Sequence, residues 1–277
     1  MNRADSALGA SPRALPLFCS HAGPEGAPPV LLLHGITGSR RYWMPRVLPL
    51  ATRYRLLMPD LPGFGRSPKP FVDYSMEFFS EAVLGCLEQQ GLSDRAIPII
   101  GHSLGALVGL EMAARQPSQV ERLALLSVPR FASPDVAHLV MLAGSSSYRK
   151  LLTVNSVTAN LEQMRRVGWG VTARSVRRLP FAVISDARKF TFRSLTSTLQ
   201  HCLMHYDVDD VLSRGAQEVR MMLIHGEQDQ VAPLDAVRAL THRRPFPSLH
   251  TIRGAGHHPF HTHTTTCLDL FRQFLET

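Results

Sequence analysis

The stretch that decides the fold lies near the middle of the chain and reads Ile97-Pro98-Ile99-Ile100-Gly101-His102-Ser103-Leu104-Gly105-Ala106-Leu107. A short apolar run leads into Gly-x-Ser-x-Gly, and a helical pattern of small and apolar residues follows. This arrangement is typical of a sharp strand-to-helix turn that lifts a serine hydroxyl above the strand end. Strand and helix backbones come close in such a turn, so both flanking positions must be small, as Gly101 and Gly105 are. We therefore predict that Ser103 is a nucleophile.

Length and composition place the chain among ordinary globular proteins. Its 277 residues suit one large domain, or one domain with a sizeable insertion, and 44% of them are apolar. No apolar run approaches the roughly 18 residues that span a bilayer. The segment Met1 to Pro16 lacks the apolar core of a secretory signal. We expect a cytoplasmic protein without stable membrane insertion.

Residues that commonly bind metals do not form a recognisable motif. The four cysteines are scattered along the chain: Cys19, Cys86, Cys202 and Cys267. Four histidines crowd one stretch near the C-terminus: His257, His258, His261 and His263. There is no Cys-x-x-Cys pair, and no cysteine or carboxylate falls at ligand spacing beside the histidines. We expect reduced structural thiols, no metal and no cofactor.

The net charge of +8 is concentrated in one part of the chain. The segment from Arg130 to Arg214 holds twelve Lys and Arg but six Asp and Glu. It has neither the interleaved aromatic residues nor the motif of a nucleic-acid-binding protein. We expect no nucleic-acid partner. The basic residues form a solvated helical surface, or they meet an anionic substrate or an acidic surface.

Strand and helix patterns alternate along most of the chain. Predicted strands occur within 14–21 and at 30–33, 54–60, 96–100, 120–128, 218–224 and 249–252. Predicted helices cover 39–50, 75–90, 104–115, 234–241 and 264–275. This alternation predicts an α/β fold, with a mostly parallel twisted sheet and helices on both faces. From 130 to 213 the pattern is helical without a clear strand, so a helical insertion interrupts a core of 1–129 and 214–277.

A serine hydroxyl is a poor nucleophile near neutral pH and needs a base, which in turn needs an orienting group. His257 follows a predicted strand at a Gly-rich turn and is the base candidate, with His258 as its rival. Asp229, in the loop after its strand, is the candidate orienter. Three other carboxylates remain as alternatives: Glu227, Asp207 and Asp235. The predicted serine, aspartate and histidine all lie just past strand ends, where ligands bind in open α/β sheets.

The oxyanion formed during attack on a carbonyl must be held by hydrogen-bond donors. One donor should be the main-chain N–H of Leu104, directly after the predicted nucleophile. The other should be that of Ile36, which follows His34-Gly35 at the end of a central strand. Each such donor is typically worth about 10²–10³ in kcat.

Taken together, the motifs resemble those of the α/β-hydrolase superfamily, and more narrowly its capped serine esterases, lactonases and C–C hydrolases. The matching residues are His34-Gly35, Asp60-Leu61-Pro62-Gly63-Phe64-Gly65-Arg66-Ser67, Gly101-His102-Ser103-Leu104-Gly105, Gly226-Glu227-Gln228-Asp229 and Gly254-Ala255-Gly256-His257. The order serine, aspartate, histidine is also that of the superfamily. The resemblance implies a helical cap, or lid, over the site at 130–213, and a structural loop from Asp60 to Ser67 beside it. Because the nucleophile is serine, dehalogenase and epoxide hydrolase activities, which use aspartate, are not expected.

We expect a serine hydrolase that cleaves carboxylic esters of small to medium acyl chain through an acyl-enzyme, with a small-molecule ester as substrate. Five other activities could use the same triad: thioesterase, lactonase, C–C bond hydrolase, acyltransferase and cofactor-free perhydrolase. A non-catalytic ligand-binding receptor on the same fold is the alternative from another class. The sequence indicates neither the natural substrate nor an oligomeric state.

Overall fold

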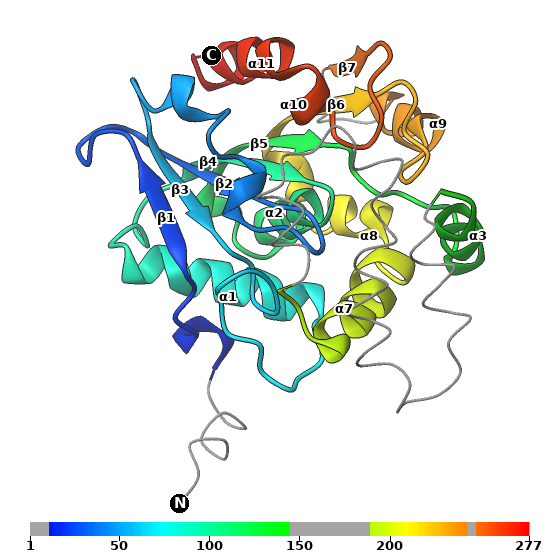
Figure 1. Ribbon diagram of the computed structural model, residues 1–277, viewed down its shortest axis with the longest axis horizontal. Coiled ribbons are helices and arrows are strands. Elements are labelled where there is room, and N and C mark those ends of the chain that lie inside the picture. Colours follow the sequence, from blue (N-terminus) through cyan, green and yellow to red (C-terminus); the bar gives the residue numbers. More distant parts are fainter. Residues whose placement is uncertain (1–10, 145–188, 243–247, 277) are drawn as a thin grey trace, which may run out of the picture.

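A twisted sheet of seven strands runs through the middle of the computed structural model, which describes residues 11–144, 189–242 and 248–276 (Figure 1). The strands are β1 Cys19–Ala22, β2 Pro29–Leu33, β3 Arg55–Pro59, β4 Ile97–His102, β5 Val120–Leu126, β6 Arg220–Gly226 and β7 Leu249–Ile252. Their order across the sheet is β1-β3-β2-β4-β5-β6-β7. β1 pairs antiparallel with β3, and the remaining pairs are parallel. This confirms the predicted fold class.

Both faces of the sheet are buried, which explains why its central strands are apolar along most of their length. Along β2, Leu31 and Leu33 belong to a core cluster with residues of α1 (Met76–Gln89) and α2 (Leu104–Arg115). Val30 and Leu32 belong to the opposite cluster, with residues of α10 and α11. α10 spans Pro259–Thr262 and α11 spans Thr264–Glu276. Figure 1 shows α1 and α11 on opposite sides of the sheet.

The helix predicted over 39–50 is wrong. The structure has two short 3-10 turns there, η3 at Arg40–Tyr42 and η4 at Leu48–Leu50. Pro45 and Pro49 provide the physical reason, because proline lacks the N–H that a continuous helix needs and its ring clashes with the preceding turn. The apolar residues that suggested a helix are still buried against the sheet, so their periodicity reported burial rather than helix.

Between β5 and β6 the described elements are helical. They are α3 Pro134–Gly144, α7 Phe192–Thr198, a π-helical turn at Leu199–Met204, α8 Val208–Ser213 and a 3-10 turn, η7, at Ala216–Glu218. α8 packs on α2, so the end of this segment lies on the same side of the sheet as α1 and α2 (Figure 1). The predicted cap also includes residues 145–188, which lie outside the described residues. The division into core and cap therefore stays a prediction.

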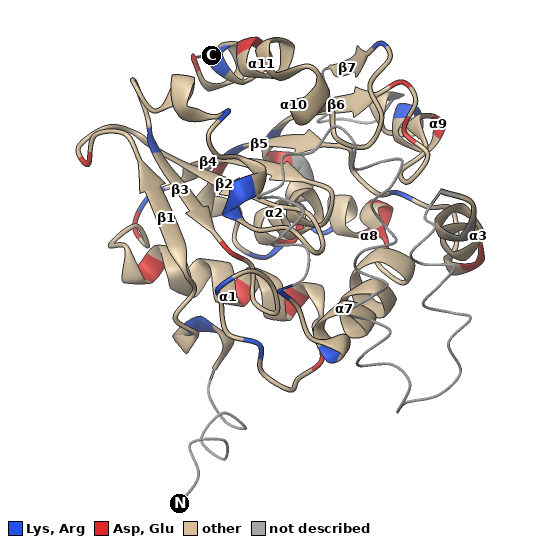
Figure 2. Ribbon diagram, viewed as in Figure 1, with Lys and Arg blue, Asp and Glu red and all other residues tan. Residues whose placement is uncertain are grey.

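Basic and acidic residues are interspersed along the described ribbon (Figure 2). Eight of the twelve basic residues between Arg130 and Arg214 fall within 145–188, outside the described part. The idea that positive charge in the cap meets an anionic substrate thus also stays a prediction. In the part of the chain that the structure describes, no helix has both the length and the apolar character that crossing a bilayer needs.

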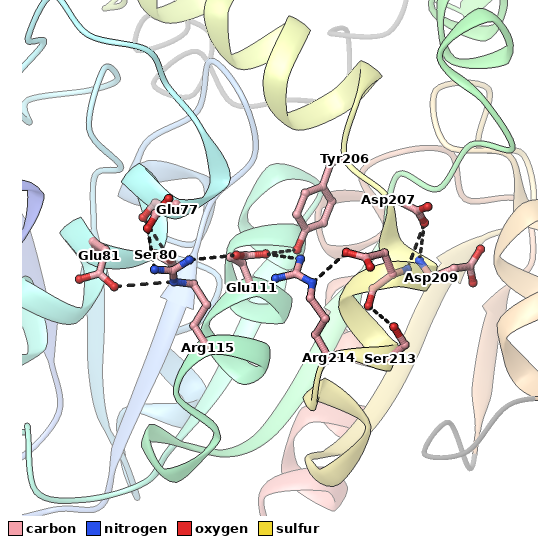
Figure 3. Close-up of polar contacts among 11 residues, drawn as sticks. Glu77, Ser80, Glu81, Glu111, Arg115, Tyr206, Asp207, Asp209, Ser213 and Arg214 are labelled. Atoms are coloured by element: carbon pink, nitrogen blue, oxygen red, sulfur yellow. Dashed lines mark hydrogen bonds and ion pairs between the residues drawn. The ribbon is translucent and has the colours of Figure 1, made fainter.

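A buried carboxylate on α2, that of Glu111, joins three parts of the fold (Figure 3). The hydroxyl of Tyr206, which precedes α8, donates to Glu111 Oε2 at 2.9 Å. The guanidinium groups of Arg214 and Arg115 lie 3.6 and 3.9 Å from its carboxylate. Arg115 also donates to Glu77 of α1 at 2.6 Å. The network fastens the chain returning from the predicted cap to the helix that follows Ser103.

We expect Glu111→Ala to lower the free energy of unfolding by about 2–3 kcal/mol, because it leaves the partly buried Tyr206 hydroxyl without its acceptor and removes the charge beside two half-exposed arginines. Tyr206→Phe should cost about 1 kcal/mol. Urea unfolding measures both. Asp269→Ala, which removes an exposed ion pair with Arg272, is the control and should change stability by under about 0.5 kcal/mol. A Glu111→Ala protein as stable as that control would show that the network contributes nothing.

Candidate active site

Ser103 occupies the turn between β4 and α2 in a strained conformation, with φ 52° and ψ −116°. Its main-chain N–H donates to the carbonyl of Leu126 at 2.9 Å, which fixes the turn to β5. A Cβ on Gly101 would lie 2.4 Å from the carbonyl oxygen of Gly105. A Cβ on Gly105 would lie 2.3 Å from that of Leu33. Both positions therefore require glycine, for the reason that the sequence suggested.

Three predicted residues, each from a different strand end, come together at this turn. Nε2 of His257 lies 3.1 Å from Ser103 Oγ, and its Nδ1 lies 2.8 Å from Oδ2 of Asp229. A carboxylate can only accept, so Nδ1 carries the proton and Nε2 presents a lone pair to the serine hydroxyl. That is the direction in which a proton would move from the hydroxyl to the imidazole.

The alternative residues lie elsewhere. His258, the rival base, contacts the ring of Tyr42, and His257 is the histidine whose ring lies at Ser103. Glu227 accepts a main-chain N–H from the turn after β7, Asp207 caps α8, and Asp235 pairs with an arginine of its own helix. None of these contacts involves the Ser103 hydroxyl.

Both carboxylate oxygens of Asp229 are held in place. Oδ1 accepts the N–H groups of Val231 and Ala232, each at 2.9 Å. Oδ2 faces His257, and Nε2 of His225 lies 3.4 Å from it while contacting the carbonyl of Ala232 at 2.7 Å. Burial alone would raise the pKa of Asp229, but the charge and hydrogen bond of His257 and the N–H of Ala232 outweigh it, so the pKa lies below its usual range. The carboxylate is therefore ionised and fixed in direction.

His225 was not singled out from the sequence. It lies near the end of β6 and precedes Asp229 by four residues. This position near a strand end is the sequence feature that could have marked it as a residue of the site. Burial lowers its pKa, and the carboxylate of Asp229 only partly offsets this. A neutral ring that donates to a carbonyl braces the aspartate loop without adding charge.

The loop after β2, which carries Ile36, is fixed by the neighbouring strand end. Nε2 of His34 accepts the N–H of Leu61 at 2.8 Å, which leaves its Nδ1–H to donate to the carbonyl of Gly35 at 2.8 Å. Leu104, directly after Ser103, is the first residue of α2. The N–H groups in the first turn of a helix have no acceptor within the helix, so that of Leu104 can serve a ligand. Both predicted oxyanion donors thus lie just past the ends of central strands, Ile36 after β2 and Leu104 after β4.

The fully buried Asp60 organises the loop from Asp60 to Ser67. Its carboxylate accepts the main-chain N–H groups of Arg40 at 2.7 Å and Arg66 at 2.8 Å. Gly65 has φ +52°, and a Cβ there would lie 2.3 Å from Asp60 Oδ2, so the turn can wrap around the carboxylate only with glycine. The hydrogen bond from Arg40 thus ties this loop, which follows β3, to the segment that follows Ile36.

Beside His257 lies a group of rings formed by the buried Tyr42, His102 and His261 and the partly buried His258. Tyr42 contacts His102 at 4.4 Å and His261 at 4.6 Å, and His102 contacts His258 at 5.2 Å between ring centroids. Burial, with added repulsion from neighbouring cations, lowers the pKa of His258 to about 3 and that of His261 to about 4. All four cysteines are free, and among the described residues no three His, Cys, Asp or Glu side chains are grouped to hold a metal ion.

These buried histidines should make the protein lose stability in mild acid. Their pKa values in the folded state lie below the unfolded value of about 6.5, so stability is complete above about pH 6.5 and falls toward about pH 4 as the unfolded chain takes up protons. Each group contributes about 1.4 kcal/mol per pH unit. His261→Gln should reduce the slope by that amount in urea unfolding series between pH 7 and 5. An unchanged slope would mean that His261 takes up its proton equally in the folded and unfolded states, so that burial does not lower its pKa.

Comparison with known proteins identifies the fold family of the chain. Residues 28–264 match the family described as alpha/beta hydrolase fold. A pimeloyl-[acyl-carrier protein] methyl ester esterase of Methylococcus capsulatus is 29% identical over 262 residues, which cover 92% of this chain and 96% of that protein. Among solved structures, the enol-lactonase from Burkholderia xenovorans matches with a TM-score of 0.75 at 22% identity, covering 97% of this chain and 99% of that one.

A thermophilic esterase from Thermogutta terrifontis matches with a TM-score of 0.71 at 21% identity, covering 95% of this chain and 93% of that one. Because the family match extends over most of the sequence, the chain belongs to the alpha/beta hydrolase fold family. This confirms the resemblance seen in the motifs.

Proposed function

We propose that the protein is a serine hydrolase that cleaves carboxylic esters of small to medium acyl chain through an acyl-enzyme. The observation that carries the proposal is the unbroken hydrogen-bond chain from Ser103 Oγ through His257 to Asp229. The Methylococcus relative supports an ester as the bond cleaved, because that protein is named as a methyl ester esterase.

In the first half of the reaction, Ser103 Oγ attacks the ester carbonyl carbon while His257 Nε2 takes the hydroxyl proton. The carbonyl oxygen becomes an oxyanion, which the N–H groups of Ile36 and Leu104 stabilise. When the tetrahedral intermediate collapses, the bond to the alcohol oxygen breaks and the alcohol leaves with the proton from His257. The acyl group remains on Ser103.

In the second half, a water molecule attacks the acyl carbon and gives a proton to His257. Collapse of this intermediate releases the carboxylic acid and returns the proton to Ser103. Asp229 stays ionised, holds the imidazole in the Nδ1–H tautomer and stabilises the imidazolium in both halves. None of these steps requires a metal or a cofactor.

We expect Ser103→Ala to lower kcat for p-nitrophenyl esters by about 10⁶ and to abolish labelling by a fluorophosphonate, because it removes the attacking oxygen. Asp229→Asn should lower kcat by about 10⁴, because an amide donor favours the wrong imidazole tautomer. Asp235→Asn, an exposed carboxylate on α9 (Leu234–Arg238), is the matched control and should behave as wild type. Initial rates over a series of acyl chain lengths measure all three.

Extending the series to thioesters, lactones and added alcohols separates the ester hydrolase from the alternative activities. Faster turnover of matched thioesters or lactones would identify the leaving group as sulfur or a ring alkoxide instead. Transfer of the acyl group to an added alcohol in preference to water would identify an acyltransferase. A wild-type protein that resists fluorophosphonate and binds esters without turnover would be a receptor, and the proposed function would fail.

A further inference from the structure

His102 is a buried titratable residue that the steps above do not use. It is the last residue of β4, and its Nε2 lies 2.8 Å from the main-chain carbonyl oxygen of His257. A carbonyl can only accept, so Nε2 carries the proton and donates it. This hydrogen bond joins the residue beside Ser103 to the turn that carries the imidazole, although the two histidines are 155 positions apart in the sequence.

The ring of His102 is held on several sides. Tyr42 stacks on it, with centroids 4.4 Å apart and planes within 17°. A Cβ on Gly35 would lie 2.8 Å from its Nδ1, so that glycine allows the close approach of the ring. The rings of His257 and His258 lie at 5.1 and 5.2 Å. The donor is therefore fixed before any substrate arrives.

The charge of His102 suits a bracing role. Burial, and then the charges of His257 and His258, keep its pKa well below the usual value. It therefore stays neutral when His257 gains a proton, and it adds no positive charge beside the imidazolium. His257 itself follows Gly254-Ala255-Gly256, a segment with two glycines and little intrinsic stiffness. The turn is hydrogen-bonded at Ala255, whose carbonyl accepts the N–H of Gln228 at 2.8 Å, and the bond from His102 adds a contact at His257 itself, whose Nε2 lies 3.1 Å from Ser103 Oγ.

We propose that His102 is a positioning residue, whose Nε2–H holds the carbonyl of His257 and so keeps that imidazole in line with Ser103 Oγ. The inference rests on the proposed function, in which His257 is the base. The positioning role requires an uncharged N–H donor at residue 102, which the amide of glutamine can supply. Phenylalanine retains a ring against Tyr42 but has no donor.

The test compares His102→Phe with His102→Gln. We expect His102→Phe to lower kcat for p-nitrophenyl acetate by about 10–100-fold while KM changes by less than about twofold, since a small displacement of a reacting group has effects of this size. His102→Gln should restore most of the loss. Leu84→Ala, a buried truncation in α1, controls for lowered thermal stability alone and should retain the wild-type kcat.

The second readout is the far-downfield proton resonance of the N–H between His257 and Asp229, which reports the placement of the imidazole without turnover. It should broaden or vanish in His102→Phe and persist in His102→Gln and Leu84→Ala. A His102→Phe protein with wild-type kcat and an unchanged resonance would overturn the proposal, as would a glutamine variant as impaired as phenylalanine. If the wild type resists fluorophosphonate, the hydrolase proposal fails, and the resonance alone decides the role of His102.

Discussion

The backbone conformation of Ser103 is the constraint on which the rest of the structure depends. A non-glycine residue at φ 52° costs on the order of 1–3 kcal/mol and persists only where its surroundings enforce it. Here β4 is paired on one side with β2 and on the other with β5, and the N–H of Ser103 is bonded to Leu126. The turn from β4 to α2 that carries Ser103, the elbow, is therefore held by the most central part of the sheet.

The strand order then distributes the other groups around the elbow. Asp229 follows β6 and His257 follows β7, both on the β5 side of β4, whereas Ile36 follows β2 on the other side. The base and its orienting carboxylate thus come from strands on one side of β4, whereas Ile36, one of the two expected oxyanion donors, comes from the strand on the other side. Parallel pairing brings all these strand ends to the same edge of the sheet. Around them, His102, His225, His258 and His261 are all held neutral by burial, so the ionised Asp229 faces no competing cation.

Much of this arrangement could be predicted from the sequence, because the decisive features are local. Apolar runs mark the buried strands, Gly-x-Ser-x-Gly marks the elbow, and Asp229 and His257 each follow a strand directly. The helix over 39–50 was wrong because apolar periodicity outweighed Pro45 and Pro49. The sequence favoured His257 over His258 as the base but kept His258 as a rival, because both follow the same turn and its backbone path decides which ring faces Ser103. The contacts of His102 and His225 depend on packing between distant segments, which no local pattern encodes.

A crystal structure of the enzyme after reaction with a small alkyl fluorophosphonate would test the central claim most directly, namely that one strained turn presents Ser103 both to His257 and to two main-chain donors. The account predicts phosphorus bonded to Ser103 Oγ, with the phosphonyl oxygen about 2.7–3.1 Å from the main-chain nitrogens of Ile36 and Leu104. Phosphorus on another residue, or a phosphonyl oxygen directed away from both nitrogens, would contradict it.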